Sequence, residues 1–213
     1  LMQSVPKFVP AGQTTQMVVG ADNETDQDVI LMADRHYKEF KLKRVYYSGY
    51  IPINTEEKAL PAVGTAPPLL RENRLYQSDW LMRFYGFEAK EIVNNQHPNL
   101  DLEVDPKLSW ALRNPELFPV DINKADYRMI LRVPGIGVRS AKKIVSARRF
   151  GKIHIDQLKR MGVAYNRAQH FIRCADTPQF IKDLMPSQIR HQILQGGQSK
   201  YTSQLSPQLG LGF

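Results

Sequence analysis

The first half of the chain alternates between short apolar runs and a longer stretch with helical spacing. The run TQMVVGA, residues 15–21, is β-branched and ends in Gly, which predicts a buried strand. In the next stretch Thr25 and Asp28 resemble a capping box, and apolar residues recur at helical spacing over 29–40. The run KRVYYSGYIPI, residues 43–53, predicts a second strand. Strand, helix and strand in this order are typical of a βαβ unit with parallel strands.

Helices are predicted for the rest of the first half. The stretch RENRLYQSDWLMRFYGF predicts a helix that ends at Gly86 and packs an aromatic stripe, within 76–84, into the core. Asp105 followed by Pro106 predicts the start of another helix, because Asp caps the first N–H groups and Pro fits the first helical position. Residues 1–118 are therefore expected to form one α/β part of the protein.

Residues 119–185 are predicted to form short helices only. Asn123 is expected to cap the helix KADYRMILRV, PGIG makes a tight turn, and VRSAKKIVSARRF forms the next helix. The order helix, tight turn, helix recurs in IDQLKRM, GVA and YNRAQHFIRC, which indicates a weak internal repeat. The segment PQFIKDLM predicts a last helix, which ends at Pro186. Residues 186–213 are rich in Gln, Ser and Gly without a sustained period, and they are predicted to form a flexible tail.

Positive charge is concentrated in the helical second part. The net charge of the chain is +8, but residues 1–120 carry 13 Lys or Arg against 16 Asp or Glu. Residues 121–185 carry 14 Lys or Arg against 5 Asp or Glu, a net charge of +9. A localised basic surface of this kind predicts a polyanionic partner. An ordinary solvated basic face is the alternative that charge alone leaves open.

Composition excludes several classes of protein. Cys174 is the only cysteine, so this chain alone builds neither a disulfide framework nor a Cys-based zinc or iron–sulfur site. No apolar run reaches the ~18 residues that span a bilayer, and the first residues lack the regions of a signal peptide. We expect a cytoplasmic protein with no membrane partner. Because residue 1 is Leu rather than Met, a piece of a longer protein is also expected.

The most informative stretch is LRVPGIGVRSAKKIV, residues 131–145. Gly135 and Gly137 lack a Cβ atom, so the backbone there can adopt positive φ and approach another molecule closely. A helix that begins at Gly137 leaves its first N–H groups without intrahelical acceptors, and the helix dipole adds partial positive charge. Basic side chains in its first turns add charge: Arg139, Lys142 and Lys143. The stretch therefore predicts a site for an oxyanion such as a backbone phosphate.

At these positions the sequence resembles the helix-hairpin-helix DNA-binding motif. The residues that carry the resemblance are Val133, Pro134, Gly135, Ile136, Gly137 and Ala141. It implies that backbone amides hold a DNA phosphate and that loop carbonyls hold a monovalent cation. It assigns DNA binding to Pro134, Gly135, Ile136, Gly137, Val138, Arg139, Ser140, Lys142 and Lys143. The segment RMGVAYNRAQHFI resembles a degenerate second copy, in which Gly162 is kept and Ala164 replaces the second Gly.

The chain also resembles a family of radical S-adenosylmethionine (SAM) proteins of DNA modification or repair. The resemblance rests on KFVPAGQTTQMVVGADNETDQDVI, KRVYYSGYIPI, LLRENRLYQSDWLMRFYGF and the C-terminal hairpin domain. It implies that the two strands are the last of a partial (β/α)6 barrel and that Val18 and Gly20 help to seat S-adenosylmethionine. Glu24 is expected to be a surface residue before the Thr25 cap. The CxxxCxxC motif that holds a 4Fe–4S cluster is absent, so this chain alone is expected to be inactive.

These observations predict the C-terminal portion of a radical SAM enzyme that grips DNA backbone, without sequence preference, through residues 119–185. DNA is favoured over RNA. The full-length protein is expected to bind S-adenosylmethionine and a 4Fe–4S cluster, with the missing half of the barrel upstream or on another chain. Two alternatives stay open: a non-enzymatic helical protein-interaction module, and a protein like the helix-hairpin-helix DNA glycosylases. In the latter Asp156 stands at the distance of the catalytic Asp, although it also reads as the start of the next helix, and Arg139 stands where some members use Lys.

Overall fold

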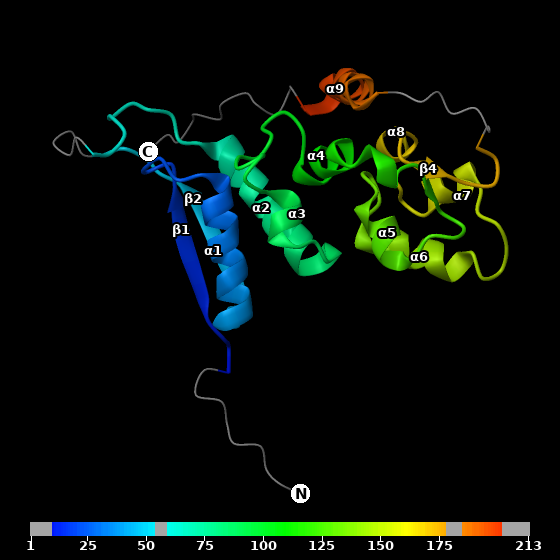
Figure 1. Ribbon diagram of the computed structural model, residues 1–213, viewed down its shortest axis with the longest axis horizontal. Helices are drawn as coiled ribbons and strands as arrows, with labels where there is room; N and C mark the ends of the chain where they lie inside the picture. Colours follow the sequence, from blue (N-terminus) through cyan, green and yellow to red (C-terminus); the bar gives the residue numbers. More distant parts are fainter. Residues whose placement is uncertain (1–9, 54–58, 178–184, 202–213) are drawn as a thin grey trace, which may run out of the picture. The chain divides into compact units, whose positions relative to one another are not determined.

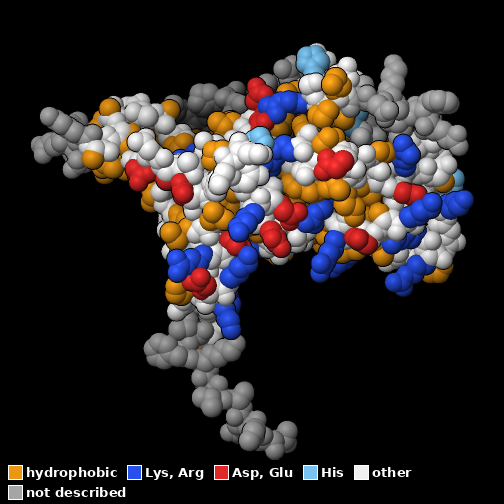
Figure 2. All heavy atoms as spheres, in the orientation of Figure 1, with side chains coloured by type: hydrophobic (Ala, Val, Ile, Leu, Met, Phe, Trp, Pro, Cys, Tyr) orange, Lys and Arg blue, Asp and Glu red, His pale blue; other side chains and the backbone are white. Residues whose placement is uncertain are grey.

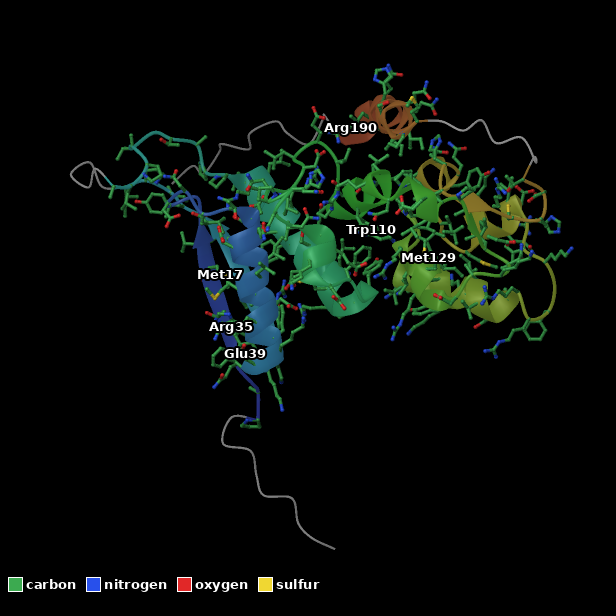
Figure 3. All side chains as sticks on the ribbon, viewed as in Figure 1. Met17, Arg35, Glu39, Trp110, Met129 and Arg190 are labelled. Atoms are coloured by element: carbon green, nitrogen blue, oxygen red, sulfur yellow. The ribbon has the colours of Figure 1, made fainter. Side chains whose placement is uncertain are left out.

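The computed structural model describes residues 10–53, 59–177 and 185–201 (Figure 1). The chain divides into two units, the first ending at Lys107 and the second beginning at Leu108. This division falls before the boundary that the sequence placed after residue 118. Aromatic packing gives the reason. The ring of Trp110 (labelled in Figure 3) lies 6.1 Å from that of Phe118, which lies 5.1 Å from that of Phe171. Residues 108–117, which the sequence assigned to the first part, therefore pack with the second unit.

The first unit is built on a βαβ arrangement, as the strand, helix, strand pattern predicted. β1 (Thr14–Val19) and β2 (Arg44–Gly49) are parallel neighbours, and α1 (Asp26–Glu39) connects them. α1 and α2 (Leu69–Tyr85) contact β2 and lie on the same side of the two-stranded sheet (Figure 1). Burial alternates along β2, because successive side chains of a strand point to opposite faces. The second face of the sheet therefore carries the exposed side chains.

Local signals set the ends of these helices. The capping box between Thr25 and Asp28 is present at the start of α1, which confirms that prediction. Gly86 ends α2 in a left-handed conformation, with φ of 69°, and its N–H donates to the carbonyl of Leu81. A Gly at this position is the usual way to end a helix, because it lacks the Cβ that makes this conformation costly.

The apolar faces of α1 and α2 differ in part from those predicted. On α1, Met32 and Phe40 are 49% and 59% exposed, whereas Ile30 is fully buried. On α2, the rings of Trp80 and Phe84 lie 4.8 Å apart, and the two side chains are about half exposed. α1 contacts α2, α3 and β2. These neighbours together decide which side chains of α1 are buried. The spacing of the apolar residues in the sequence does not show which of those residues face inward.

The remaining elements are short. None of the helices in the described ranges is long and apolar enough to cross a membrane. β3 and β4 pair in parallel, with Val120 opposite Ile172, so the part predicted to be all-α contains a small sheet. A two-residue ladder has no periodicity that a sequence pattern could show. In chain order these elements are α3 (Ala89–Ile92), α4 (Pro106–Arg113), the 3-10 helix η1 (Pro115–Leu117), β3 (Val120–Asp121), α5 (Tyr127–Arg132), α6 (Val138–Ala147), α7 (Ile155–Arg160), α8 (Tyr165–Ala168), β4 (Ile172–Arg173) and α9 (Pro186–Tyr201).

The cap of α5 corrects a prediction. The residue that caps α5 is Asp126, whose Oδ1 accepts the N–H of Met129 at 2.7 Å, and not Asn123. The side chain of Asn123 serves another segment: its Oδ1 accepts the N–H of Ile153 at 2.8 Å. An Asn or Asp side chain uses the same oxygen to cap a helix or to accept a main-chain N–H from a distant segment. The sequence alone therefore did not show which residue caps α5.

α9 lies where composition predicted a flexible tail, so that prediction is wrong for this stretch. Pro186 begins the helix rather than ending the one before it, because its fixed φ suits the first helical position. The side chain of Gln188 accepts the N–H of Met185 at 3.0 Å and so caps the start. The predicted helix PQFIKDLM, except its last residue, and the segment 202–213 lie outside the described residues.

Lys107 is a buried lysine in the first turn of α4, with its Nζ 4.7 Å from the centre of the Tyr85 ring. Burial lowers the pKa of Lys107 to about 7. The unfolded chain keeps a lysine pKa of about 10.4, so between these two pH values the unfolded state binds more protons than the folded state. We therefore expect the free energy of unfolding to rise with pH from about 7 to about 10, by at most about 1.4 kcal/mol per pH unit.

Below about pH 7 both states hold this proton, and the contribution of Lys107 becomes independent of pH. Urea unfolding at a series of pH values, followed by circular dichroism, measures this dependence. The Lys107→Met variant is the control, because it keeps the aliphatic stem without the amine. Equal slopes for the native chain and the variant would contradict the assignment.

Candidate nucleic-acid interface

The PGIG segment forms a tight turn between α5 and α6. The N–H of Ile136 donates to the carbonyl of Val133 at 3.2 Å, which closes the turn. Gly135 has a φ of 86°, a conformation that favours glycine. Gly137, with φ of −94° and ψ of 171°, is extended and is the N-cap residue of α6. Of the two glycines expected to permit positive φ, only Gly135 adopts it.

Packing against the second hairpin explains Gly135. The N–H of Ala164 donates to the carbonyl of Gly135 at 2.9 Å. A Cβ atom on Gly135 would lie 2.7 Å from the carbonyl oxygen of Ala164 and 3.2 Å from the nitrogen of Ala168. In return, the hydroxyl of Ser140 donates to the carbonyl of Met161 at 3.1 Å. The segment around α7 and α8, which is this second hairpin, therefore braces the PGIG turn, and Gly135 serves this internal contact.

The N-terminus of α6 presents main-chain donors. Its first turn closes where the N–H of Ala141 donates to the carbonyl of Gly137 at 2.9 Å. Within the part of the chain that the structure describes, the N–H groups of Gly137, Val138 and Arg139 have no hydrogen-bond acceptor, and no side chain caps this end. A helix leaves its first N–H groups free for such contacts, and its dipole adds partial positive charge beside them. An anion placed before α6 can accept hydrogen bonds from these groups.

The side chains of α6 form an exposed basic face and a buried apolar face. Arg139, Lys142 and Lys143 are exposed, whereas Ala141 and Ile144 are fully buried. Residues three and four apart share one face of a helix, which places the three basic side chains together. Figure 2 shows Lys and Arg side chains gathered around α6. The charge therefore lies on the same short helix as the main-chain donors.

The structure separates the predicted site residues into two groups. One group lies in the first turns of α6, where a ligand can reach it: Gly137, Val138, Arg139, Lys142 and Lys143. The other group shapes the turn or packs it against the second hairpin: Pro134, Gly135, Ile136 and Ser140.

Acidic residues are absent from the sequence between Asp126 and Asp156, a segment that holds eight Lys or Arg. Asp126 is engaged as the cap of α5. Asp156 lies in the first turn of α7, with a side chain that is 83% exposed and 3.9 Å from Nζ of Lys159. This position favours the interpretation of Asp156 as a helix-start residue over that of a catalytic acid. The electrostatic potential around the hairpin is thus positive, because few nearby carboxylates offset its Lys and Arg side chains.

The turn that follows α6 was not predicted from the sequence. This helix ends at Ala147, so Arg149 and Phe150 leave the helix to which they were assigned. Phe150 is 92% exposed. Gly151, directly after it, was the available signal, because glycine commonly follows the end of a helix.

The carboxyl end of β1 is closed by side chains of its own unit. The N–H of Gly20 donates to Oε1 of Glu24 at 2.7 Å, and Arg71 donates to the same oxygen at 2.9 Å. Burial opposes ionisation, but these contacts outweigh it and lower the pKa of Glu24. Glu24 thus ties the strand end together rather than lying free on the surface, which corrects that prediction. The N–H of Gly20 is therefore engaged within the unit. The roles of Gly20 and of Val18, which is 55% exposed, in seating S-adenosylmethionine stay predictions.

Cys174 is half-buried beside polar partners. Its Sγ lies 3.0 Å from the hydroxyl of Thr177 and 3.2 Å from Oδ1 of Asp176. Burial raises the pKa of the Cys174 thiol, so little thiolate is present at neutral pH. Over residues 10–53, 59–177 and 185–201, no group of three or more His, Cys, Asp or Glu side chains is arranged to hold a metal ion.

Comparison of the chain with protein-family models, with curated proteins and with solved structures finds no match. The radical SAM family, the helix-hairpin-helix motif and the monovalent cation at the turn therefore stay predictions.

Proposed function

We propose that the second unit binds the sugar–phosphate backbone of DNA at the N-terminus of α6. The observation that carries the proposal is the set of N–H groups of Gly137, Val138 and Arg139, which have no acceptor among the described residues. Lys142 and Lys143 are exposed one turn further on. All of these groups are donors, and phosphate oxygens are acceptors that occur along any nucleic acid. Contacts to phosphates carry no sequence information, so binding is independent of base sequence.

Titration of the full chain with two unrelated duplexes, at about 0.05 M and about 0.2 M salt, tests this proposal. A site that neutralises about three phosphates loses about 40-fold in affinity between these salt concentrations, because bound counterions are released. We expect equal affinity for both duplexes and a loss of this size. A helical module that docks an acidic protein predicts no duplex binding at the lower salt. A glycosylase predicts base release from a lesion-bearing duplex that is lost in Asp156→Asn.

We also propose that this unit delivers DNA to a longer radical SAM enzyme of DNA modification or repair. The support beyond the resemblance comes from the two edges of the β1–β2 sheet. The outer edge of β2 is closed by side chains that accept its N–H groups at 2.8–3.0 Å: Tyr37 for Val45, Tyr76 for Tyr47 and Glu72 for Gly49. A strand closed in this way is not available for further pairing.

The outer edge of β1 has no such cover within the described residues. The carbonyl of Val19 points toward β2, where it accepts the N–H of Tyr50. Because main-chain groups alternate in direction along a strand, those of Gln16 and Val18 point away from β2, toward the outer edge of β1. A strand edge with unpaired N–H and C=O groups is a template for pairing with a further strand. We therefore place the missing strands of the barrel beside β1. A CxxxCxxC motif in the coding region directly upstream of Leu1 would support this arrangement, and an upstream region without one would contradict the placement of these strands on the same chain.

A further inference from the structure

Phe150 is the most exposed of the large apolar side chains described, at 92%. It lies in the turn between α6 and α7, with Arg149 before it and Gly151 and Lys152 after it, all exposed. A fully solvated Phe ring gains nothing from folding, since it removes no apolar surface from water. Its exposure leaves the ring accessible to a binding partner.

The turn is fixed at both ends, so it holds Phe150 outward. Before it, a guanidinium nitrogen of Arg148 donates to the carbonyls of Ile122 and Ala125. After it, Ile153 is buried and its N–H donates to Asn123 at 2.8 Å. The N–H of Phe150 itself donates to the carbonyl of Ala147 at 3.0 Å. The protrusion is thus a preformed feature of the backbone.

The charge beside the ring indicates the kind of partner. Arg149 and Lys152 flank it, in the segment that contains eight Lys or Arg and no Asp or Glu. An aromatic ring beside cationic side chains matches a nucleic acid, because each nucleotide offers a flat base next to an anionic phosphate. An apolar protein surface would have to strip water from these charges without an opposite charge in return.

We propose that Phe150 stacks on an unpaired base of the bound nucleic acid and so gives the site a preference for strands with unstacked bases. This inference rests on the proposed phosphate site. α6 has ten residues and is therefore about 15 Å long. The ring therefore lies about one helix length from the proposed phosphate site, within reach of the same bound strand. Base–aromatic stacking does not depend on base identity, so the preference is for the unpaired state and not for a sequence.

The test compares a fully paired duplex with the same duplex carrying one unpaired 2-aminopurine, by fluorescence anisotropy with the full chain. We expect the native chain to bind the second duplex about tenfold more tightly, and Phe150→Ala to lose this factor. Its affinity for the paired duplex should stay within about twofold of native. The 2-aminopurine emission should fall when native protein is added, not with Phe150→Ala, and fall again with Phe150→Trp. Phe40→Ala, which removes an exposed Phe of the first unit, is the matched control.

Equal affinities for the two duplexes, or unchanged 2-aminopurine emission with native protein, would overturn the stacking role. If the paired duplex still binds with the expected salt dependence, the phosphate site survives that result. If neither duplex binds at low salt, both the phosphate site and the stacking role are wrong. Because Phe150 is almost fully exposed, Phe150→Ala should unfold at the same urea concentration as the native chain.

Discussion

Replacing Arg139, Lys142 and Lys143 together by Ala is expected to lower the affinity for duplex DNA by about two to three orders of magnitude at about 0.1 M salt. Each cation that neutralises a phosphate contributes about 0.9 to the slope of log K against log salt, so the slope should fall by about 2.7. The three side chains are exposed, so their removal should leave the free energy of unfolding nearly unchanged. Anisotropy titrations over a range of salt concentrations give both quantities.

The matched control removes three exposed lysines of the first unit: Lys38, Lys43 and Lys90. It changes the net charge by the same amount, so it separates a local site from a general effect of charge. We expect it to reduce affinity only slightly. Equal losses for the two triple variants would mean that net charge attracts DNA to the chain without a defined site at α6.

The second large effect is on stability. Gly135→Ala is expected to destabilise the second unit by about 2–5 kcal/mol. A positive φ costs an Ala about 1–2 kcal/mol, and overpacking adds typically about 1–3 kcal/mol. The overpacking arises because the new Cβ would lie 2.7 Å from the carbonyl oxygen of Ala164.

Gly162→Ala separates these two contributions. Gly162 has a φ of 85° in the same unit, but a Cβ there would meet only the Ser140 hydroxyl, at 3.7 Å. We expect it to lose about 1–2 kcal/mol, from the backbone conformation alone. Urea unfolding followed by Trp110 fluorescence reports on the second unit, in a background where the half-exposed Trp80 is replaced by Phe. Equal destabilisation by the two substitutions would show that the contact with Ala164 is unimportant.

Where one residue type had one local use, the sequence predicted the structure correctly. Three helix ends were predicted from residues that satisfy main-chain groups within one helical turn. They are the start of α1 at Thr25 and Asp28, the end of α2 at Gly86 and the start of α4 at Pro106. The parallel βαβ unit followed from the change of apolar period along the chain. The PGIG turn followed from the same local chemistry.

Where a residue serves a distant partner, the sequence was not sufficient. Asn123 bonds Ile153, thirty residues away, and no local pattern distinguishes this from a cap. Gly135 was interpreted as open to a ligand, whereas its neighbour is Ala164 of the second hairpin. Phe150 was assigned to the helix VRSAKKIVSARRF, whereas α6 ends at Ala147. The next residue, Arg148, donates to the carbonyls of Ile122 and Ala125, which are distant in the sequence.

The most direct test of the phosphate site is the amide signal of Gly137, Val138 and Arg139 in a ¹⁵N-labelled full chain during titration with a short duplex. Hydrogen bonding to phosphate predicts that these three amide protons shift downfield together, more than those of Tyr165 and Asn166 in the second hairpin, and that added salt reverses the shifts. A chain that binds the duplex while these three signals stay in place would contradict the account.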